Sequence, residues 1–228
     1  MANFETITVE TDLLIIGGGM GACGAAVEAA YWAKKNNVKV TVVDKAAMDR
    51  SGAVAMGLSA LNQYVGVGAG DNTVEDYVRY VRQDLMGVTR EDLVFSIARH
   101  VDSTVHLFEK WGLPIWKDEN DKYVHEGRWQ VMINGESYKI LVAEAAKNAI
   151  GVDNIIERVF ITEPRMDGDR VAGAVGFSVR DEKFYVCKAK AVMVAAGGAV
   201  SVFRPRSVGE GLGRSWYPPF NSGSSAYM

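Results

Sequence analysis

The sequence predicts an α/β fold in which a strand–helix–strand unit opens the chain and an antiparallel β-meander comes later. Three observations carry this prediction. An apolar run at residues 11–17 ends in glycine, which is typical of a buried strand. An alanine-rich stretch and a β-branched run follow it in that order. Beyond residue 150, three β-type segments are separated by short polar turns.

The opening unit lies within the first 44 residues. Alanines and a glutamate favour a helix over residues 22–37, and two lysines near its end suit the negative pole of the helix dipole. The run "VKVTVVD" at residues 38–44 predicts a second strand. Strand, glycine turn, helix and strand together form a βαβ unit.

Three further helices are expected in the middle of the chain. Thr73 and Asp76 have the spacing of a capping box, and Thr89 and Asp92 repeat it before a helix that runs to a glycine stop at Gly112. Another helix is predicted over residues 137–150, with a glycine just past its end. Residues 50–70 are rich in small side chains, which suits either close approach to a large flat ligand or a flexible loop.

The meander is predicted from three segments at residues 154–163, 170–180 and 182–198. A turn at Asp167 and Gly168 joins the first two, and "RDEK" joins the second and third. We predict no helix or strand over residues 204–228, which are rich in glycine, serine and aromatic residues.

Charge and composition exclude several classes of protein. A net charge of −3 gives no reason to expect nucleic acid or an acidic membrane surface as a partner. The sequence has no membrane span and no signal peptide, so we expect a cytoplasmic protein. Cys23 and Cys187 are the only cysteines, and we expect two buried thiols rather than a disulfide framework or a metal site.

The stretch "GGGMGA" carries the strongest functional signal. Gly17, Gly19 and Ala22 match the pattern G-x-G-x-x-G/A between a predicted strand and a predicted helix. The first glycine makes a tight turn, the second lets the backbone approach a diphosphate, and the third position must be small for helix packing. Asp44 ends the second strand, twenty residues after Gly24. A carboxylate at this position can accept hydrogen bonds from the ribose hydroxyls. The pattern predicts a Rossmann-like dinucleotide site.

Flavin is favoured over nicotinamide for two reasons. A simple nicotinamide-binding domain does not need the antiparallel meander, and "VAAGG" at residues 194–198 resembles the second glycine pair of two-dinucleotide-fold flavoproteins. "SGAVAMGLSALN" further resembles the flavin-facing loop of the succinate dehydrogenase and fumarate reductase flavoprotein superfamily. Within that superfamily, "EGRWQVMINGESYK", "LMGVTREDL", "HVDSTVHLFEKWGLP" and "FRPRSVGEGLGRSWY" resemble the alpha subunits of dissimilatory adenylylsulfate reductase.

This resemblance implies an enzyme that binds FAD and interconverts adenosine 5′-phosphosulfate with sulfite and AMP through a flavin N5–sulfite adduct. It implies that residues 1–228 are the N-terminal segment of the FAD-binding domain, an incomplete domain whose capping and helical domains lie outside this chain. The resemblance also implies an iron–sulfur beta subunit as partner. Consistent with this, two separated cysteines cannot supply the four thiolates of a cluster.

The resemblance assigns candidate site residues. Those expected to bind FAD are Gly17, Gly18, Gly19, Met20, Gly21, Ala22, Asp44, Lys45, Ser51, Gly52, Val159, Ala196 and Gly197. Those expected in the catalytic site are Asn62, Trp216 and Glu126. For these three, ordinary alternatives stay open: local backbone hydrogen bonds for the asparagine, a core or interface position for the tryptophan, and a surface carboxylate for the glutamate.

Two other functions also stay open. A flavoprotein of the same superfamily could act on a dicarboxylate such as fumarate. Alternatively, the 228 residues alone could bind FAD without catalysis. The histidines His100 and His106 fall in a predicted helix, and we expect structural roles for them.

Overall fold

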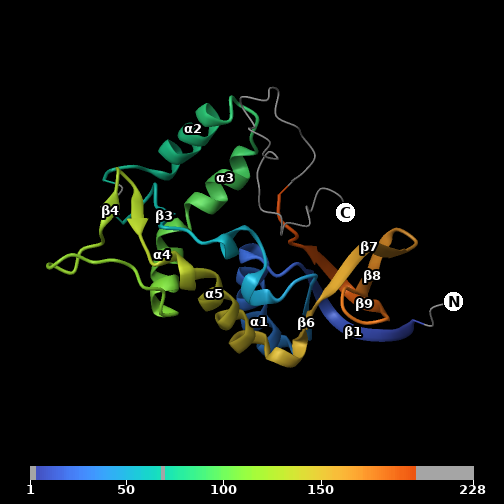
Figure 1. The fold of residues 1–228 in the computed structure, drawn as a ribbon. Helices are drawn as coiled ribbons and strands as arrows, with labels where there is room; N and C mark the ends of the chain where they lie inside the picture. The colour runs from blue at the N-terminus through green and yellow to red at the C-terminus, as the bar shows by residue number, and fades with distance from the viewer. Residues whose placement is uncertain (1–3, 68–69, 199–228) are drawn as a thin grey trace, which may run out of the picture. The chain divides into compact units, whose positions relative to one another are not determined.

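A computed structural model describes residues 4–67 and 70–198. The chain divides into two compact units, drawn in Figure 1. The sheet unit comprises the described parts of Met1–Met56 and Val142–Met228, and the helical unit comprises Gly57–Leu141.

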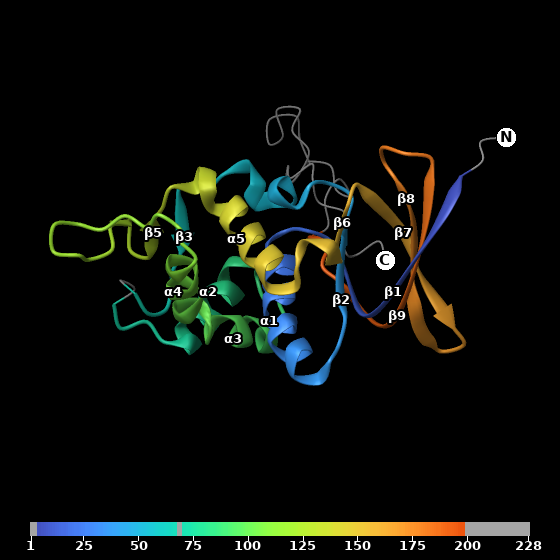
Figure 2. The same cartoon turned by 90° about the horizontal axis from the view of Figure 1, so that it is seen from below.

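The sheet unit holds six strands in the order β6-β2-β1-β9-β8-β7. Neighbours among β6, β2, β1 and β9 are parallel, whereas β9, β8 and β7 form an antiparallel meander. Figure 2 shows β7 and β8 as a hairpin, with the turn predicted at Asp167 and Gly168. The predicted α/β fold with a meander is confirmed. The strands are β1 (Glu5–Ile16), β2 (Val40–Asp44), β6 (Ile155–Glu157), β7 (Val159–Asp167), β8 (Arg170–Ser178) and β9 (Lys183–Val194).

Two strand predictions need correction. β1 begins at Glu5 rather than at residue 11, because its first half pairs with β9 from Lys183 onward. The segment predicted as one strand at residues 154–163 is two strands, divided at Arg158, whose φ is +63°. The break lets β6 extend the parallel sheet beside β2 while β7 pairs with β8.

Helix α1 (Met20–Asn36) lies against the parallel strands and ends, near the predicted position, before Asn37 in the left-handed conformation. Its buried residues include Ala22, Ala26 and Ala30, spaced four apart along one face. Small side chains on that face let the helix approach the sheet closely. Cys23 is buried beside them.

The central parallel strands β1 and β2 are buried on both faces near the glycine turn, as expected of parallel strands. Leu14 and Ile15, which point to opposite faces, are both fully buried. On one face, the strands β1 and β2 pack against the meander. The cluster there comprises Leu14, Ile16, Val43, Val159, Ile161, Ala174 and Cys187.

The helical unit contains a three-stranded sheet that the sequence analysis did not predict. Its order is β3-β5-β4, and both pairings are antiparallel. The unit's elements are β3 (Ala60–Asn62), α2 (Val74–Asp84), α3 (Glu91–Ala98), α4 (Val101–Lys110), β4 (His125–Glu126) and β5 (Gln130–Met132). Helix α5 (Gly135–Ile150) begins here and ends in the sheet unit, and the short 3-10 helices are η1 (Met48–Arg50), η2 (Ala53–Met56) and η3 (Val152–Asn154).

One of the two predicted capping boxes is present. Thr73 and Asp76 exchange the reciprocal hydrogen bonds that begin α2. The second prediction is wrong, because Asp92 instead accepts two hydrogen bonds from Arg90 and α3 begins at Glu91. The helix predicted to run to Gly112 is also divided into α3 and α4, and His100 is the N-cap residue of α4 rather than part of a helix.

The glycine stops are confirmed. Gly112 and Gly151 follow α4 and α5 with φ of +93° and +85°. Across residues 4–67 and 70–198, no helix is long and apolar enough to cross a membrane.

Both cysteines are buried, as predicted. Burial raises the pKa of the Cys187 thiol from 9.0 to about 11. Because the folded-state pKa is the higher one, the stability that this group contributes is present below pH 9 and is lost as the pH rises toward 11. We expect neither native thiol to react quickly with a disulfide reagent at pH 8.

The check is a thiol titration with Ellman's reagent, before and after unfolding in guanidinium chloride. Two thiols per chain should react only after unfolding. A Cys187→Ser variant should show one reactive thiol after unfolding. Rapid reaction of a thiol in the native protein would contradict the buried placement.

Candidate functional site

The glycine turn lies between β1 and α1, where the chain reverses at the carboxyl end of a central strand. Gly17 has a φ of +116°, and a Cβ atom there would lie 2.4 Å from the carbonyl oxygen of Ala195. The Ala195 N–H donates to the Ile16 carbonyl at 2.8 Å. The structure therefore brings Ala196 and Gly197, predicted from the second glycine pair, next to the first glycine stretch.

Two other predicted groups border the same turn. Asp44 ends β2 with 5% of its surface exposed, and a Cβ atom on Gly18 would lie 2.5 Å from its Oδ2. A Cβ atom on Gly52 would lie 2.8 Å from the Cα of Gly19. Ser51, beside Gly52, is 3% exposed. The turn is thus enclosed by β2 on one side and by the segment after η1 on another, with glycine required at each contact.

The N-terminus of α1 presents free donors. Its N-cap residue, Gly19, has no side chain that could cap the first-turn N–H groups, and no acidic residue lies in the first turn. The first-turn N–H groups of a helix have no partner within the helix, and the dipole favours an anion there. A Cβ atom on Gly21 would meet nothing within 4 Å. Met20 and Ala22 belong to this first turn.

Lys45 and Val159 are the remaining predicted FAD-binding residues. The Lys45 Nζ is 5.9 Å from the ring centre of Phe160. Val159 begins β7 with 1% of its surface exposed, so it can offer a ligand only its backbone. The preceding residue, Arg158, donates its N–H to the Ala46 carbonyl at 3.4 Å, which links this strand to the end of β2.

These residues fit a dinucleotide. The glycine contacts leave no room for side chains, the helix N-terminus offers donors to a diphosphate, and Asp44 offers a carboxylate at the strand end. All of the predicted FAD-binding residues lie in the sheet unit.

The helical unit brings two of the three predicted catalytic residues together. Asn62, the last residue of β3, lies opposite Gln130 of β5, and Gln130 in turn lies opposite Glu126 of β4. Directly opposed residues project on the same face, so the three side chains form a row. The Asn62 Oδ1 accepts a hydrogen bond from the Gln130 Nε2 at 3.3 Å.

Glu126 is exposed, which suits both a site carboxylate and an ordinary surface carboxylate. Trp216 lies outside the described residues. Arg128, near Glu126 in the sequence, has its guanidinium 5.9 Å from the ring centre of Trp129.

A pocket of about 690 Å³ adjoins Asn62 within the helical unit. Its walls include Phe108 and Tyr138, and burial raises the pKa of the Tyr138 hydroxyl. Gln63 also lines it, is fully buried, and has an Oε1 atom without a hydrogen-bond partner among the described residues. The sequence analysis missed both glutamines, because Gln63 follows and Gln130 begins a strand of only three residues, too short to show a usable period.

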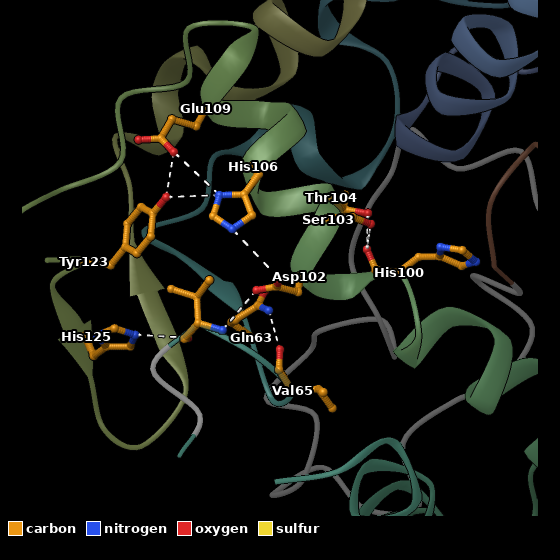
Figure 3. Close-up of polar contacts among 11 residues, drawn as sticks. Gln63, Val65, His100, Asp102, Ser103, Thr104, His106, Glu109, Tyr123 and His125 are labelled. Atoms are coloured by element: carbon orange, nitrogen blue, oxygen red, sulfur yellow. Dashed lines mark hydrogen bonds and ion pairs between the residues drawn. The ribbon is translucent and has the colours of Figure 1, made fainter. Parts of the chain in front are cut away.

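The histidines form part of a surface network shown in Figure 3. The Tyr123 hydroxyl donates to the Glu109 Oε2 at 2.6 Å, and the His106 Nδ1 lies 3.3 Å from that hydroxyl. Burial and the Glu109 carboxylate raise the pKa of Tyr123 to about 12. Lys117, 2.8 Å from Glu109, and the Tyr123 hydroxyl lower the pKa of that carboxyl. Over the described ranges, no group of three or more histidine, cysteine or acidic side chains could hold a metal ion.

A family model and two relatives match this chain. The family model of an FAD binding domain matches residues 12–226. The adenylylsulfate reductase subunit alpha of Megalodesulfovibrio gigas is 55% identical over 98% of this chain, which spans 37% of that relative's length. A flavoprotein subunit of the 8-methylmenaquinol:fumarate reductase of Wolinella succinogenes is 27% identical over 86% of this chain, which spans 32% of that relative.

A solved structure is similar along almost the whole chain. It is an adenosine-5-phosphosulfate reductase in complex with sulfite, described as a covalent adduct. It is 63% identical, with a TM-score of 0.87, and the match covers 99% of this chain and 36% of that one.

Proposed function

Since this chain belongs to the FAD binding domain family, we propose that it forms the FAD-binding part of an adenylylsulfate reductase. Its cofactor is FAD. In this proposal, both units belong to the N-terminal segment of the FAD-binding domain, and the protein interconverts adenosine 5′-phosphosulfate with sulfite and AMP. One observation carries the proposal: the match in sequence and fold to a reductase solved with sulfite, at 63% identity over 99% of the chain.

The sheet unit would hold the cofactor. Gly17–Gly19 and the first turn of α1 would bind the diphosphate through backbone N–H groups. The Asp44 carboxylate would accept hydrogen bonds from ribose hydroxyls. Bound FAD supplies two-electron redox chemistry, and the protein supplies its orientation.

The reaction sets clear demands on side chains. Reduction of adenosine 5′-phosphosulfate takes two electrons, breaks the bond between sulfur and the bridging oxygen, and releases sulfite and AMP. The sulfonate group must therefore be held by hydrogen-bond donors in a fixed position. Asn62 offers such a donor: its Oδ1 accepts from Gln130, which leaves the amide Nδ2 to face a substrate.

The electrons must come from outside this chain. Its two cysteines are buried and lie far apart in the sequence, whereas a four-iron cluster needs four thiolates. We therefore include an iron–sulfur beta subunit as the partner that exchanges electrons with FAD. Two reduced thiols also suit a cytoplasmic location, which is part of the same proposal.

The test is a spectral titration of the complete, FAD-loaded gene product with sulfite, with and without AMP. We expect sulfite to lower the flavin absorbance band and AMP to change the amplitude or the midpoint of that titration. Sulfite oxidation that requires AMP should appear with an artificial electron acceptor. A flavin spectrum that does not change with sulfite but changes with fumarate or succinate would instead support a dicarboxylate reductase. The Wolinella succinogenes relative, 27% identical, is a fumarate reductase subunit.

A further inference from the structure

We propose that Asp102 is a positioning residue that fixes Asn62 by anchoring the segment that follows β3. This inference rests on the proposed function, because it concerns the placement of a side chain assigned to that reaction. Asp102 lies in the first turn of α4, forty residues after Asn62 in the sequence. All the residues involved belong to the helical unit.

The anchor is a close contact between the carboxylate and the backbone. The Val67 N–H donates to the Asp102 Oδ1 at 3.1 Å. Gly66 has a φ of +87°, and a Cβ atom there would lie 2.5 Å from the same oxygen. The glycine therefore makes the space that the carboxylate occupies, and no other residue type fits this turn without displacing Asp102.

The chain between Asn62 and this anchor is short and constrained. The Gln63 N–H donates to the Trp129 carbonyl at 2.7 Å, and its buried side-chain amide donates to the Val65 carbonyl. The His125 Nε2 lies 3.3 Å from the Val67 carbonyl, which adds a contact from β4. Only four residues separate Val67 from Asn62, so a shift at Val67 would be transmitted along this short segment to Asn62.

Asn62 depends on such an anchor because β3 is a weak element. The strand has three residues and, among the strands that the structure describes, lies at the edge of its sheet and pairs with β5 alone. Asn62 is its last residue, where the ladder ends. The contacts that hold residues 63–67 therefore determine where the Asn62 side-chain amide lies.

His106 faces the other oxygen of the carboxylate. Its Nε2 lies 3.9 Å from the Asp102 Oδ2, one helical turn further along α4, as Figure 3 shows. The neighbouring hydroxyls of Ser103 and Thr104 both donate to the His100 carbonyl, so neither turns toward Asp102. With one oxygen on Val67 and the other facing His106, the carboxylate has a defined orientation.

An acidic residue in the first turn of a helix also has an ordinary role, which is to stabilise the helix dipole. Two conservative variants separate the two roles. Asp102→Asn removes the charge and keeps an oxygen in the same place, whereas Asp102→Glu keeps the charge and moves the carboxylate outward. Positioning predicts rescue by asparagine, and a dipole effect predicts rescue by glutamate.

The experiment measures kcat and KM for AMP-dependent sulfite oxidation in the complete, FAD-loaded protein. Asp102→Ala and Asp102→Glu should lower kcat about tenfold to a hundredfold, because small misplacements of a reacting group cost this much. KM should change less than about threefold, and Asp102→Asn should stay within about threefold of wild type in kcat. Asp92→Ala is the matched control, since Asp92 lies in the first turn of α3 and pairs with Arg90.

The positioning role would be overturned if Asp102→Ala kept a kcat close to that of the wild type. It would also be overturned if Asp102→Glu restored kcat and Asp102→Asn did not. A second readout keeps the inference testable if the wild type does not oxidise sulfite, which would count against the proposed function alone. Amide hydrogen exchange at Val67 should rise about tenfold in Asp102→Ala and not in Asp92→Ala. Unchanged exchange there would overturn the anchor itself.

Discussion

Replacing Gly17 with alanine should abolish FAD binding and destabilise the sheet unit by about 3 kcal/mol. The added Cβ atom would lie 2.4 Å from the Ala195 carbonyl oxygen, and the φ of +116° is strained for any other residue. The turn would have to open, which would move the backbone donors away from the diphosphate. The measurement is the flavin-to-protein absorbance ratio of the purified variant, together with its thermal unfolding.

Gly24→Ala is the matched control. Gly24 lies in α1, has no positive φ, and its Cβ atom would meet nothing within 4 Å. Alanine there should retain FAD and raise stability by about 0.5 to 1 kcal/mol, because glycine in a helix interior has more conformational freedom to lose. Equal loss of flavin in both variants would show that the turn has no special role.

Replacing Asn62 with alanine should lower kcat about a hundredfold while leaving bound FAD unchanged. The physical reason is the loss of one preorganised donor to the charge of the sulfonate group, an effect that typically has this size. The backbone of residue 62 should stay in β3, since its pairing with Gln130 uses main-chain groups. Steady-state rates of AMP-dependent sulfite oxidation, with the flavin content of each preparation, measure this.

Asn120→Ala provides the comparison for Asn62. Asn120 lies in an exposed turn, where its backbone N–H donates to Asp118, so its side chain should be dispensable. Normal kcat in Asn62→Ala would remove this residue from the catalytic site and leave its hydrogen bond to Gln130 as a local structural contact.

The sequence predicted the features of the sheet unit that have a local cause. The Gly17 turn follows from strand, glycines and helix in succession, and the hairpin at Gly168 follows from its turn residues. The division at Arg158 was missed, since nothing in "IIERVFI" marks a left-handed residue. Pairing with two different neighbours in the sheet imposes that conformation on Arg158.

The helical unit was predicted less completely, for a related reason. β3 and β5 contain three residues each and pair across 68 positions, from Asn62 to Gln130. Neither has a pattern long enough to indicate a strand. Asn62 and Glu126 were named from resemblance to a family, whereas the residue that joins them, Gln130, became visible only in the fold. The roles of all three stay predictions.

The pairing of β1 with β9 has a consequence for how the protein is made. β1 spans residues from Glu5, yet one of its two neighbours begins at Lys183, so this edge of β1 stays open while the ribosome adds the residues between them. Contacts of such long sequence separation close slowly, and an open apolar strand edge invites pairing with other chains. Gly17 also packs on Ala195, so the glycine turn reaches its final form only after β9 has arrived. FAD should therefore be taken up late in synthesis, and a nascent chain halted before residue 183 should need a chaperone rather than its cofactor.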